Sequence, residues 1–244
     1  MRILCLCPTY GRPKLVANLL AQFQAQTHPR HLCTLLIYDD AGQYEPCCGY
    51  NWQVISTPQR CRHLQGKYND MLAHFGVLGS GQYDAIVPMD DDDIYLPNHL
   101  ETYAAALARH KWVYPAQIWS LHNRAVPVLD RPQWAACGVR LDALQAVGGW
   151  PETKAGNGDQ LFLRSLYELC PPGDPTINGS PTFVFRWAST EHPHAQGYCT
   201  PDKVAGAWYD NFPQHDKTFV PALQPVMDVQ TKAVFQLFGH APPV

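Results

Sequence analysis

Residues 85–97 read AIVPMDDDDIYLP, an apolar run that passes into four consecutive aspartates. Four like charges in a row repel one another and normally lie in a solvated segment. Here they follow what reads as a buried strand, where charge is costly unless a positive group is held beside it. In extended backbone alternate side chains share a face, so we expect Asp90 and Asp92 on one face and Asp91 and Asp93 on the other.

Two carboxylates on one face at a strand end suit a hard divalent cation, such as Mg2+, that also carries phosphate oxygens. The run therefore predicts a metal site that includes Asp90 and Asp92. The alternative interpretation is a solvent-exposed turn in which Asp93 caps the helix that follows.

The length and charge of the chain narrow the class of protein. Its 244 residues are enough for a large core in one α/β domain. The net charge of −3 argues against coating nucleic acid or an anionic membrane by charge alone. The longest apolar stretches are too short for a membrane-spanning helix, and the apolar segment before Pro8 is too short for a signal peptide.

The nine cysteines include no CxxC pair, and this usage predicts reduced thiols and a cytoplasmic location. A zinc site formed by Cys47, Cys48 and His63 is disfavoured, because the spacing of these residues is not that of a known zinc motif.

Strand and helix patterns alternate along the first 110 residues. Short apolar runs predict strands at 2–7, 32–38, 52–56 and 85–89, and helical spacing predicts helices at 13–26, at 68–75 and from Pro97. This alternation is typical of a parallel sheet with helices on its faces. Ligands of such sheets bind beyond the carboxyl ends of the strands.

Three of these strands end in groups that can bind a ligand. The first ends in Pro8-Thr9-Tyr10, the second in Asp39-Asp40 and the fourth in the aspartate run. We expect all three to lie along one rim of the sheet, and this convergence points to a site more strongly than any one motif. Taken alone, Asp39 and Asp40 could be only a turn or capping pair.

Four segments together resemble the family 2 glycosyltransferases with the GT-A fold. They are PTYGRP (8–13), LLIYDDAG (35–42), GKYND (66–70) and MDDDDIYLP (89–97). The chain departs from the family pattern at Gly11, where Asn is common, and at Ala41-Gly42, which stand in place of Gly-Ser. Neither change removes a charged ligand.

The resemblance implies a single α/β domain with the GT-A (Rossmann-like) fold. Its central sheet would be mostly parallel and flanked by helices, with a small antiparallel sheet on the acceptor side. The domain would span residues 1–199, of which 1–110 form the nucleotide-sugar half and 111–199 the acceptor and catalytic half. Residues 200–244 would form a C-terminal extension packed on the domain.

The same resemblance implies the residues that hold the donor. Pro8, Thr9 and Tyr10 would frame the nucleotide base, and Asp40 would accept a hydrogen bond from the uracil ring. The implied nucleotide-sugar-binding residues are Pro8, Thr9, Tyr10, Arg12, Asp39, Asp40, Lys67, Asn69, Asp90 and Asp91. Arg60 and Arg62 lie in the same region, but solvated loop charges explain them equally well.

The resemblance also implies the metal ligands and the catalytic base. The ligands would be Asp90, Asp92 and His194, holding Mn2+ or Mg2+, although a histidine in a loop is more often plain surface. Asp159 would be the base, since Asp159, Phe162 and Arg164 trace the family pattern [ED]-D-x-x-[LF]-x-x-R, with Gly158 replacing the first acid. The alternative for Asp159 is a helix-capping acid that the helix dipole favours.

The second half of the chain has its own predicted elements. They are a hairpin of strands 114–121 and 125–129, a strand at 134–139, a helix at 140–147 stopped by Gly148-Gly149, a helix from Asp159, a strand at 183–187 and a helix at 227–238.

These features together predict an inverting, metal-dependent glycosyltransferase of the hexosyltransferase type. It would move a sugar from a nucleotide-sugar donor, by resemblance a UDP-sugar, to an acceptor with a free hydroxyl. The acceptor would be a glycan, a protein, a small molecule or a hydroxymethylated DNA base. Nucleic acid would thus be a partner only as an acceptor substrate, and its base would have to leave the stack.

Two other functions stay open at the level of sequence. A nucleotidyltransferase that makes sugar nucleotides needs a glycine-rich basic loop after the first strand, and PTYGRP lacks the repeated glycines. A non-catalytic nucleotide-sugar-binding module would share the fold. A haloacid-type phosphatase is disfavoured, because its D-x-D follows the first strand.

Overall fold

The central sheet is built around β1 (Ile3–Thr9), whose residues are all buried. The computed structural model describes residues 1–61, 63–74, 76–77, 81–120, 124–127, 133–151, 158–176, 180, 182–186 and 218–242. β1 pairs in parallel with β2 (Cys33–Asp39) on one side and β5 (Ala85–Pro88) on the other. Strands in the middle of such a sheet are covered on both faces, which explains their nearly continuous apolar sequence.

The sheet has seven strands in the order β3-β4-β2-β1-β5-β10-β7. β4 (Trp52–Ser56) extends the parallel part, so the four longest strands run in one direction. The short strands β3 (Cys47–Cys48), β10 (Gly138–Arg140) and β7 (Trp112–Val113) pair antiparallel at the two edges. The predicted α/β architecture with a mostly parallel central sheet is confirmed.

A second, four-stranded sheet lies beside the first, in the order β6-β11-β8-β9. Its strands are β6 (Ile94–Tyr95), β11 (Phe183–Phe185), β8 (Gln117–Ser120) and β9 (Arg124–Pro127). β8 and β9 form the predicted hairpin. The sheet is antiparallel except between β8 and β11, which run parallel.

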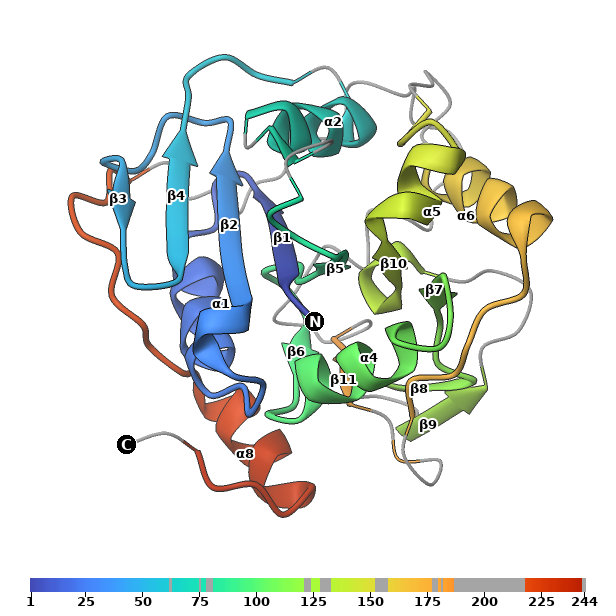
Figure 1. Cartoon of the computed structure of the whole chain (residues 1–244). Coiled ribbons are helices and arrows are strands. Elements are labelled where there is room, and N and C mark those ends of the chain that lie inside the picture. The colour runs from blue at the N-terminus through green and yellow to red at the C-terminus, as the bar shows by residue number, and fades with distance from the viewer. Residues whose placement is uncertain are drawn as a thin grey trace, which may run out of the picture.

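Helices lie where the apolar spacing predicts them. α1 (Pro13–Gln24) begins at a proline, which suits a first helical turn, and it buries Val16, Leu19, Leu20 and Phe23. The other helices are α2 (Leu64–His74), α4 (His99–Leu107), α5 (Leu141–Ala146), α6 (Gly158–Leu169) and α8 (Val229–Leu237), with 3-10 turns at Arg30–Leu32 and Trp134–Ala136. Figure 1 shows α2 at the end of the sheet toward which β2 and β4 point.

The predicted strand at 134–139 is wrong in its first half. The chain makes a 3-10 turn at Trp134–Ala136 and only then enters β10. The turn places the Trp134 ring edge-on against Trp150 and Phe162, with ring centroids 5.0 and 5.2 Å apart. Burial of this large aromatic surface outweighs the strand propensity of the local sequence.

The described C-terminal part, residues 218–242, packs on the rest of the chain. Val220 bridges to Tyr44, and α8 packs beside α1 at the foot of the sheet (Figure 1). The division at residue 199 stays a prediction. Among the residues that the structure describes, no helix is long and apolar enough to cross a membrane.

Candidate functional site

The carboxyl ends of β1, β2 and β5 converge on one pocket. Thr9, at the end of β1, donates its hydroxyl to Asp91 Oδ2 at 2.5 Å. Lys67 of α2 donates from Nζ to the Thr9 carbonyl at 2.6 Å and to Asp40 Oδ1 at 2.7 Å. The predicted rim is therefore confirmed, because Thr9 and Lys67 link the ends of β1, β2 and β5.

Twelve of the described residues line this pocket. They are Pro8, Thr9, Tyr10, Arg12, Asp40, Arg60, Cys61, His63, Leu64, Lys67, Asp90 and Asp92.

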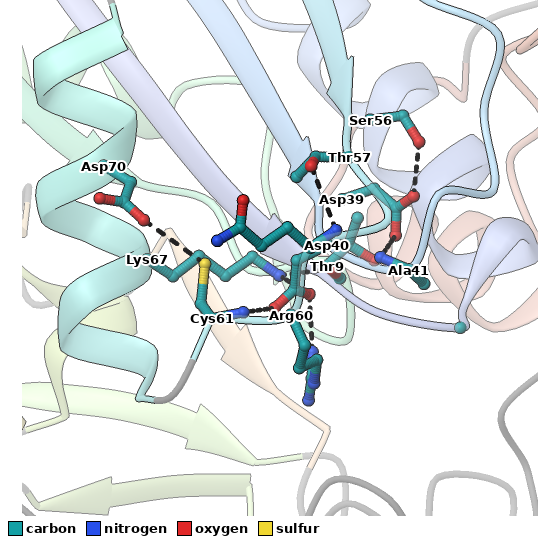
Figure 2. Close-up of polar contacts among 12 residues, drawn as sticks. Thr9, Asp39, Asp40, Ala41, Ser56, Thr57, Arg60, Cys61, Lys67 and Asp70 are labelled. Atoms are coloured by element: carbon teal, nitrogen blue, oxygen red, sulfur yellow. Dashed lines mark hydrogen bonds and ion pairs between the residues drawn. The ribbon is translucent and has the colours of Figure 1, made fainter.

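Asp40 lies on one side of the pocket, with three donors on its carboxylate (Figure 2). Arg60 Nη1 is 2.6 Å from Oδ1, beside the Lys67 ammonium, and the Cys61 N–H donates to Oδ2 at 3.0 Å. Burial lowers the pKa of Lys67, and the ion pair with Asp40 partly offsets this shift. The Arg60 guanidinium also lies 3.6 Å from the centre of the Tyr10 ring.

Asp39 differs from its neighbour, because it stabilises the turn after β2. Its carboxylate accepts the N–H groups of Ala41 at 3.1 Å and Gln43 at 2.7 Å, and the Ser56 hydroxyl at 2.8 Å. Asp39 is fully buried and does not line the pocket. These contacts are those of a turn residue, which was the alternative interpretation of this acid.

The aspartate run leaves the strand and turns. β5 ends at Pro88, and the Asp93 N–H points back to the Asp90 carbonyl at 3.4 Å. The backbone is thus not extended as expected, and the expected division of the side chains holds only in part, because Asp93 places one oxygen within 4.8 Å of oxygens of Asp90 and Asp92. Asp90 and Asp92 line the pocket, whereas Asp91 and Asp93 are buried beneath it.

Three carboxylates of this run can share a cation. One oxygen from each of Asp90, Asp92 and Asp93 lies within 4.8 Å of the other two. Burial and the charges of Asp92 and Asp91 raise the pKa of Asp90 to about 7. Carboxylate oxygens crowded together in this way are the ligands that Mg2+ and Mn2+ prefer, so the residues present fit a divalent ion.

The positively charged side chain of Arg12 contacts two carboxylates of the aspartate run. Its guanidinium lies 2.9 Å from Asp91 Oδ1 and 2.8 Å from Asp92 Oδ2. Burial raises the pKa of Asp91 to about 6, and Arg12 opposes that shift. Arg12 thereby keeps a negative charge on carboxylates that would otherwise repel one another.

Two tyrosines, Tyr68 and Tyr95, position Asp90. The sequence patterns predicted this role for neither of them. The Tyr68 hydroxyl donates to Asp90 Oδ1 at 3.1 Å, and the Tyr95 hydroxyl accepts the Asp90 N–H at 2.7 Å. Both tyrosines are buried. The apolar pattern that predicts the helix at 68–75 includes Tyr68, but a pattern of apolar residues carries no signal for where a phenol oxygen points.

Comparison with known proteins bears on the fold. No protein-family model matches the chain, and no curated protein matches it either. Among solved structures, S. aureus TarS 1–349 in complex with UDP-GlcNAc superposes with a TM-score of 0.61 at 16% identity, covering 80% of this chain and 61% of that one. The mannosyltransferase PcManGT from Pyrobaculum calidifontis, in complex with GDP-Man and Mn2+, gives 0.55 at 15%, covering 80% and 59%.

The chain has the GT-A fold. It spans only about three fifths of the length of TarS 1–349, and 38% of a longer TarS structure. In this GT-A fold the pocket lies at the carboxyl ends of the parallel strands, where ligands of α/β sheets bind.

Asn69 and Asp159 lie away from the lining of the GT-A pocket. The Asn69 amide donates to the Trp150 carbonyl at 2.9 Å and accepts the Trp150 N–H at 3.3 Å. Trp150 stacks on Tyr68 and packs on Phe162 of α6. Asp159 lies in the first turn of α6, where it accepts a hydrogen bond from Gln160 at 3.2 Å. Aromatic packing thus joins the helix of Asp159 to the tyrosine that holds Asp90.

His194, the predicted third metal ligand, and Arg62 lie outside the described residues. Within the described ranges, the aspartate cluster is the group whose ligand atoms have metal-compatible spacing, and Cys47, Cys48 and His63 do not form another.

Proposed function

We propose that the protein is a metal-dependent glycosyltransferase that inverts the configuration of the sugar it transfers from a nucleotide-sugar donor. One observation carries the proposal. In a GT-A fold, a buried acid, Asp40, and two carboxylates of the metal-compatible cluster, Asp90 and Asp92, line the same pocket. The neighbours solved with UDP-GlcNAc and with GDP-Man and Mn2+ share this fold. The resemblance favours UDP as the carrier.

Different residues of the pocket would then bind the nucleotide base, the metal ion and the phosphates. Pro8, Thr9 and Tyr10 would enclose the base beside Asp40, with Lys67 holding that carboxylate in place. Asp90, Asp92 and Asp93 would hold Mn2+ or Mg2+, which supplies charge neutralisation for the departing diphosphate. Arg12 would exchange part of its contact with Asp92 for the same phosphates.

Asp159 would act as the general base toward the acceptor. A carboxylate at the start of α6 can take the proton of a hydroxyl, and the deprotonated oxygen then attacks the anomeric carbon from the face opposite the diphosphate. One bond to the sugar forms as the bond to the diphosphate breaks. A single displacement of this kind inverts the anomeric configuration.

Isothermal titration calorimetry of UDP and GDP, each with and without Mn2+, tests the proposal. We expect one of the two nucleotides to bind tightly only when Mn2+ is present, and Asp92→Asn to remove that dependence. Asp142→Asn, an acid of the exposed Arg140 ion pair, is the control and should bind as the wild type does. Equal affinities with and without the metal for both nucleotides would contradict the proposal.

Asp159→Asn tests the base. Turnover, measured as UDP release with the donor and acceptor found in a panel screen, should fall about 10²–10⁴-fold, the usual contribution of a general base. The Kd of the donor should stay the same, because Asp159 does not line the pocket. Wild-type turnover in this variant would exclude Asp159 as the base while leaving the donor site in place.

A further inference from the structure

Arg186, which directly follows β11, buries a charged side chain against the C-terminal helix. The residue is 2% exposed, and its Nη1 lies 2.9 Å from Asp228 Oδ2. Its Nη2 donates to the Thr231 hydroxyl. Burying a guanidinium is costly, and the contacts of Nη1 and Nη2 offset part of that cost, so they constrain the end of β11.

The acceptors of Arg186 are themselves fixed to two helices. Asp228 caps α8 by accepting the Thr231 N–H at 2.6 Å. Asn18 of α1 accepts the Asp228 N–H at 3.0 Å and donates to the Thr231 hydroxyl at 3.1 Å. Asn18 and Thr231 are fully or almost fully buried. These four residues (Asn18, Arg186, Asp228 and Thr231), which we call the α8 network, join α1, α8 and β11.

The backbone of Arg186 connects this network to the aspartate run. The Arg186 N–H donates to Asp93 Oδ1 at 3.2 Å. From α1, the Gln22 amide donates to the Asp93 carbonyl at 3.3 Å and accepts the Tyr95 N–H at 2.7 Å. Asp93 is buried and is one of the three carboxylates with cation-compatible spacing. Its orientation therefore depends on where the end of β11 lies.

We propose that Arg186 is a positioning residue for the cation site, and that the α8 network sets the orientation of Asp93 through it. The inference rests on the proposed function, which places a divalent cation on Asp90, Asp92 and Asp93. Carboxylates that hold a metal depend on hydrogen bonds from residues behind them, and loss of such a partner typically weakens metal affinity about 10–100-fold. The C-terminal helix would thus belong to the metal site, although no residue of α8 lines the pocket.

The charge of Arg186 and its role in holding Asp93 predict opposite changes in cation affinity when the residue is replaced. The inference can therefore be tested. The guanidinium is a positive charge near a site for cations, so its removal should tighten cation binding if charge alone matters. If its role is to hold β11 and Asp93 in place, removal should weaken cation binding.

The experiment measures Mn2+ binding to the nucleotide-free protein by calorimetry and by the electron paramagnetic resonance of free Mn2+. We expect Arg186→Met to weaken Mn2+ binding by about tenfold, and Arg186→Lys to recover part of the loss. Thr231→Val, which changes no charge, should shift the affinity in the same direction by a smaller factor. It also serves as the test if Arg186→Met does not fold.

Phe235→Leu is the control for general loss of stability. Phe235 is a fully buried residue of α8 that packs in an apolar cluster and makes none of the hydrogen bonds above. It should lower the melting temperature yet leave Mn2+ affinity unchanged. The inference would be overturned if Arg186→Met and Thr231→Val bound Mn2+ with the same affinity as Phe235→Leu. It would also be overturned if they bound Mn2+ more tightly than the wild-type protein does. A wild-type protein that binds no Mn2+ would overturn the cation site itself.

Discussion

Lys67 and Asp40 show how a buried charge pair builds one wall of the pocket. Both side chains are almost fully buried, at 5% and 1% exposure. A charge removed from water is costly unless it is paired and hydrogen-bonded, and Lys67 meets this condition by contacting both Asp40 and the Thr9 carbonyl. The pair therefore fixes the end of β1 relative to the end of β2.

Lys67→Met should destabilise the protein by about 3 kcal/mol, the lower end of the cost of breaking a buried ion pair. The lower end applies because Arg60 and the Cys61 N–H remain on Asp40. Urea denaturation measures the change. Lys14→Met, the same substitution at an exposed position of α1, should stay within about 0.5 kcal/mol of wild type. Equal stability of the two variants would show that the pair contributes little.

At the scale of elements, Asn69 connects α2 to the segment between α5 and α6. Both polar atoms of its amide are hydrogen-bonded to the backbone of Trp150. The preceding Gly149 has φ +79°, a conformation that other residues rarely adopt, and this turn presents the Trp150 backbone to α2. The predicted role of Asn69 in donor binding thus competes with a structural one.

Asn69→Ala should lower the free energy of unfolding by about 1–3 kcal/mol, because it leaves the Trp150 N–H and carbonyl without their partner. The affinity for UDP in the presence of Mn2+ should not change. Asn98→Ala is the matched control, since the Asn98 side chain makes no capping hydrogen bond to α4. A loss of UDP affinity with unchanged stability would instead support the donor-binding role.

At the scale of the whole molecule, α4 joins the two sheets, and His99 lies at the junction. Its ring packs against Tyr95 of β6 and Tyr103 of α4, and Nδ1 lies 3.0 Å from the Thr182 hydroxyl, next to β11. His99 is fully buried, and burial lowers its pKa to about 3. The folded protein therefore keeps this histidine neutral at pH values where the unfolded chain protonates it.

This difference predicts a loss of stability in acid. Below pH 6.5 the unfolded state binds a proton at His99 that the folded state does not, so the free energy of unfolding falls as pH falls. By pH 5 the loss from this residue should reach about 2 kcal/mol. Asp90 and Asp91 act with the opposite sign, because their pKa values are raised in the folded state.

Comparison with His99→Gln isolates the contribution of His99. Urea denaturation at pH 7.5 and pH 5.0 should show a wild-type loss about 2 kcal/mol larger than that of the variant, whatever the variant's stability at neutral pH. Parallel pH profiles for the two proteins would mean that His99 is protonated in the folded state as easily as in the unfolded one.

Local patterns in the sequence were enough to predict the elements and the edge of the sheet where the site lies. Apolar runs closed by Pro8, by Asp39-Asp40 and by the aspartate run specify buried strands and their ends, because burial and turn preferences act over a few residues. Parallel strands with connecting helices then bring those ends to one edge. The resemblance correctly implied the GT-A fold, and the roles of Asp159 and His194 stay predictions.

Tertiary structure decided which partner each polar group has. Asn69 holds Trp150, and Arg186 joins Asp228 to Asp93 across 42 and 93 positions of sequence. No local spacing encodes such pairs, because they depend on how whole elements pack. The hydrogen bonds of a buried polar group are satisfied only by the neighbours that packing supplies, and those neighbours are set once the helices and both sheets are in place.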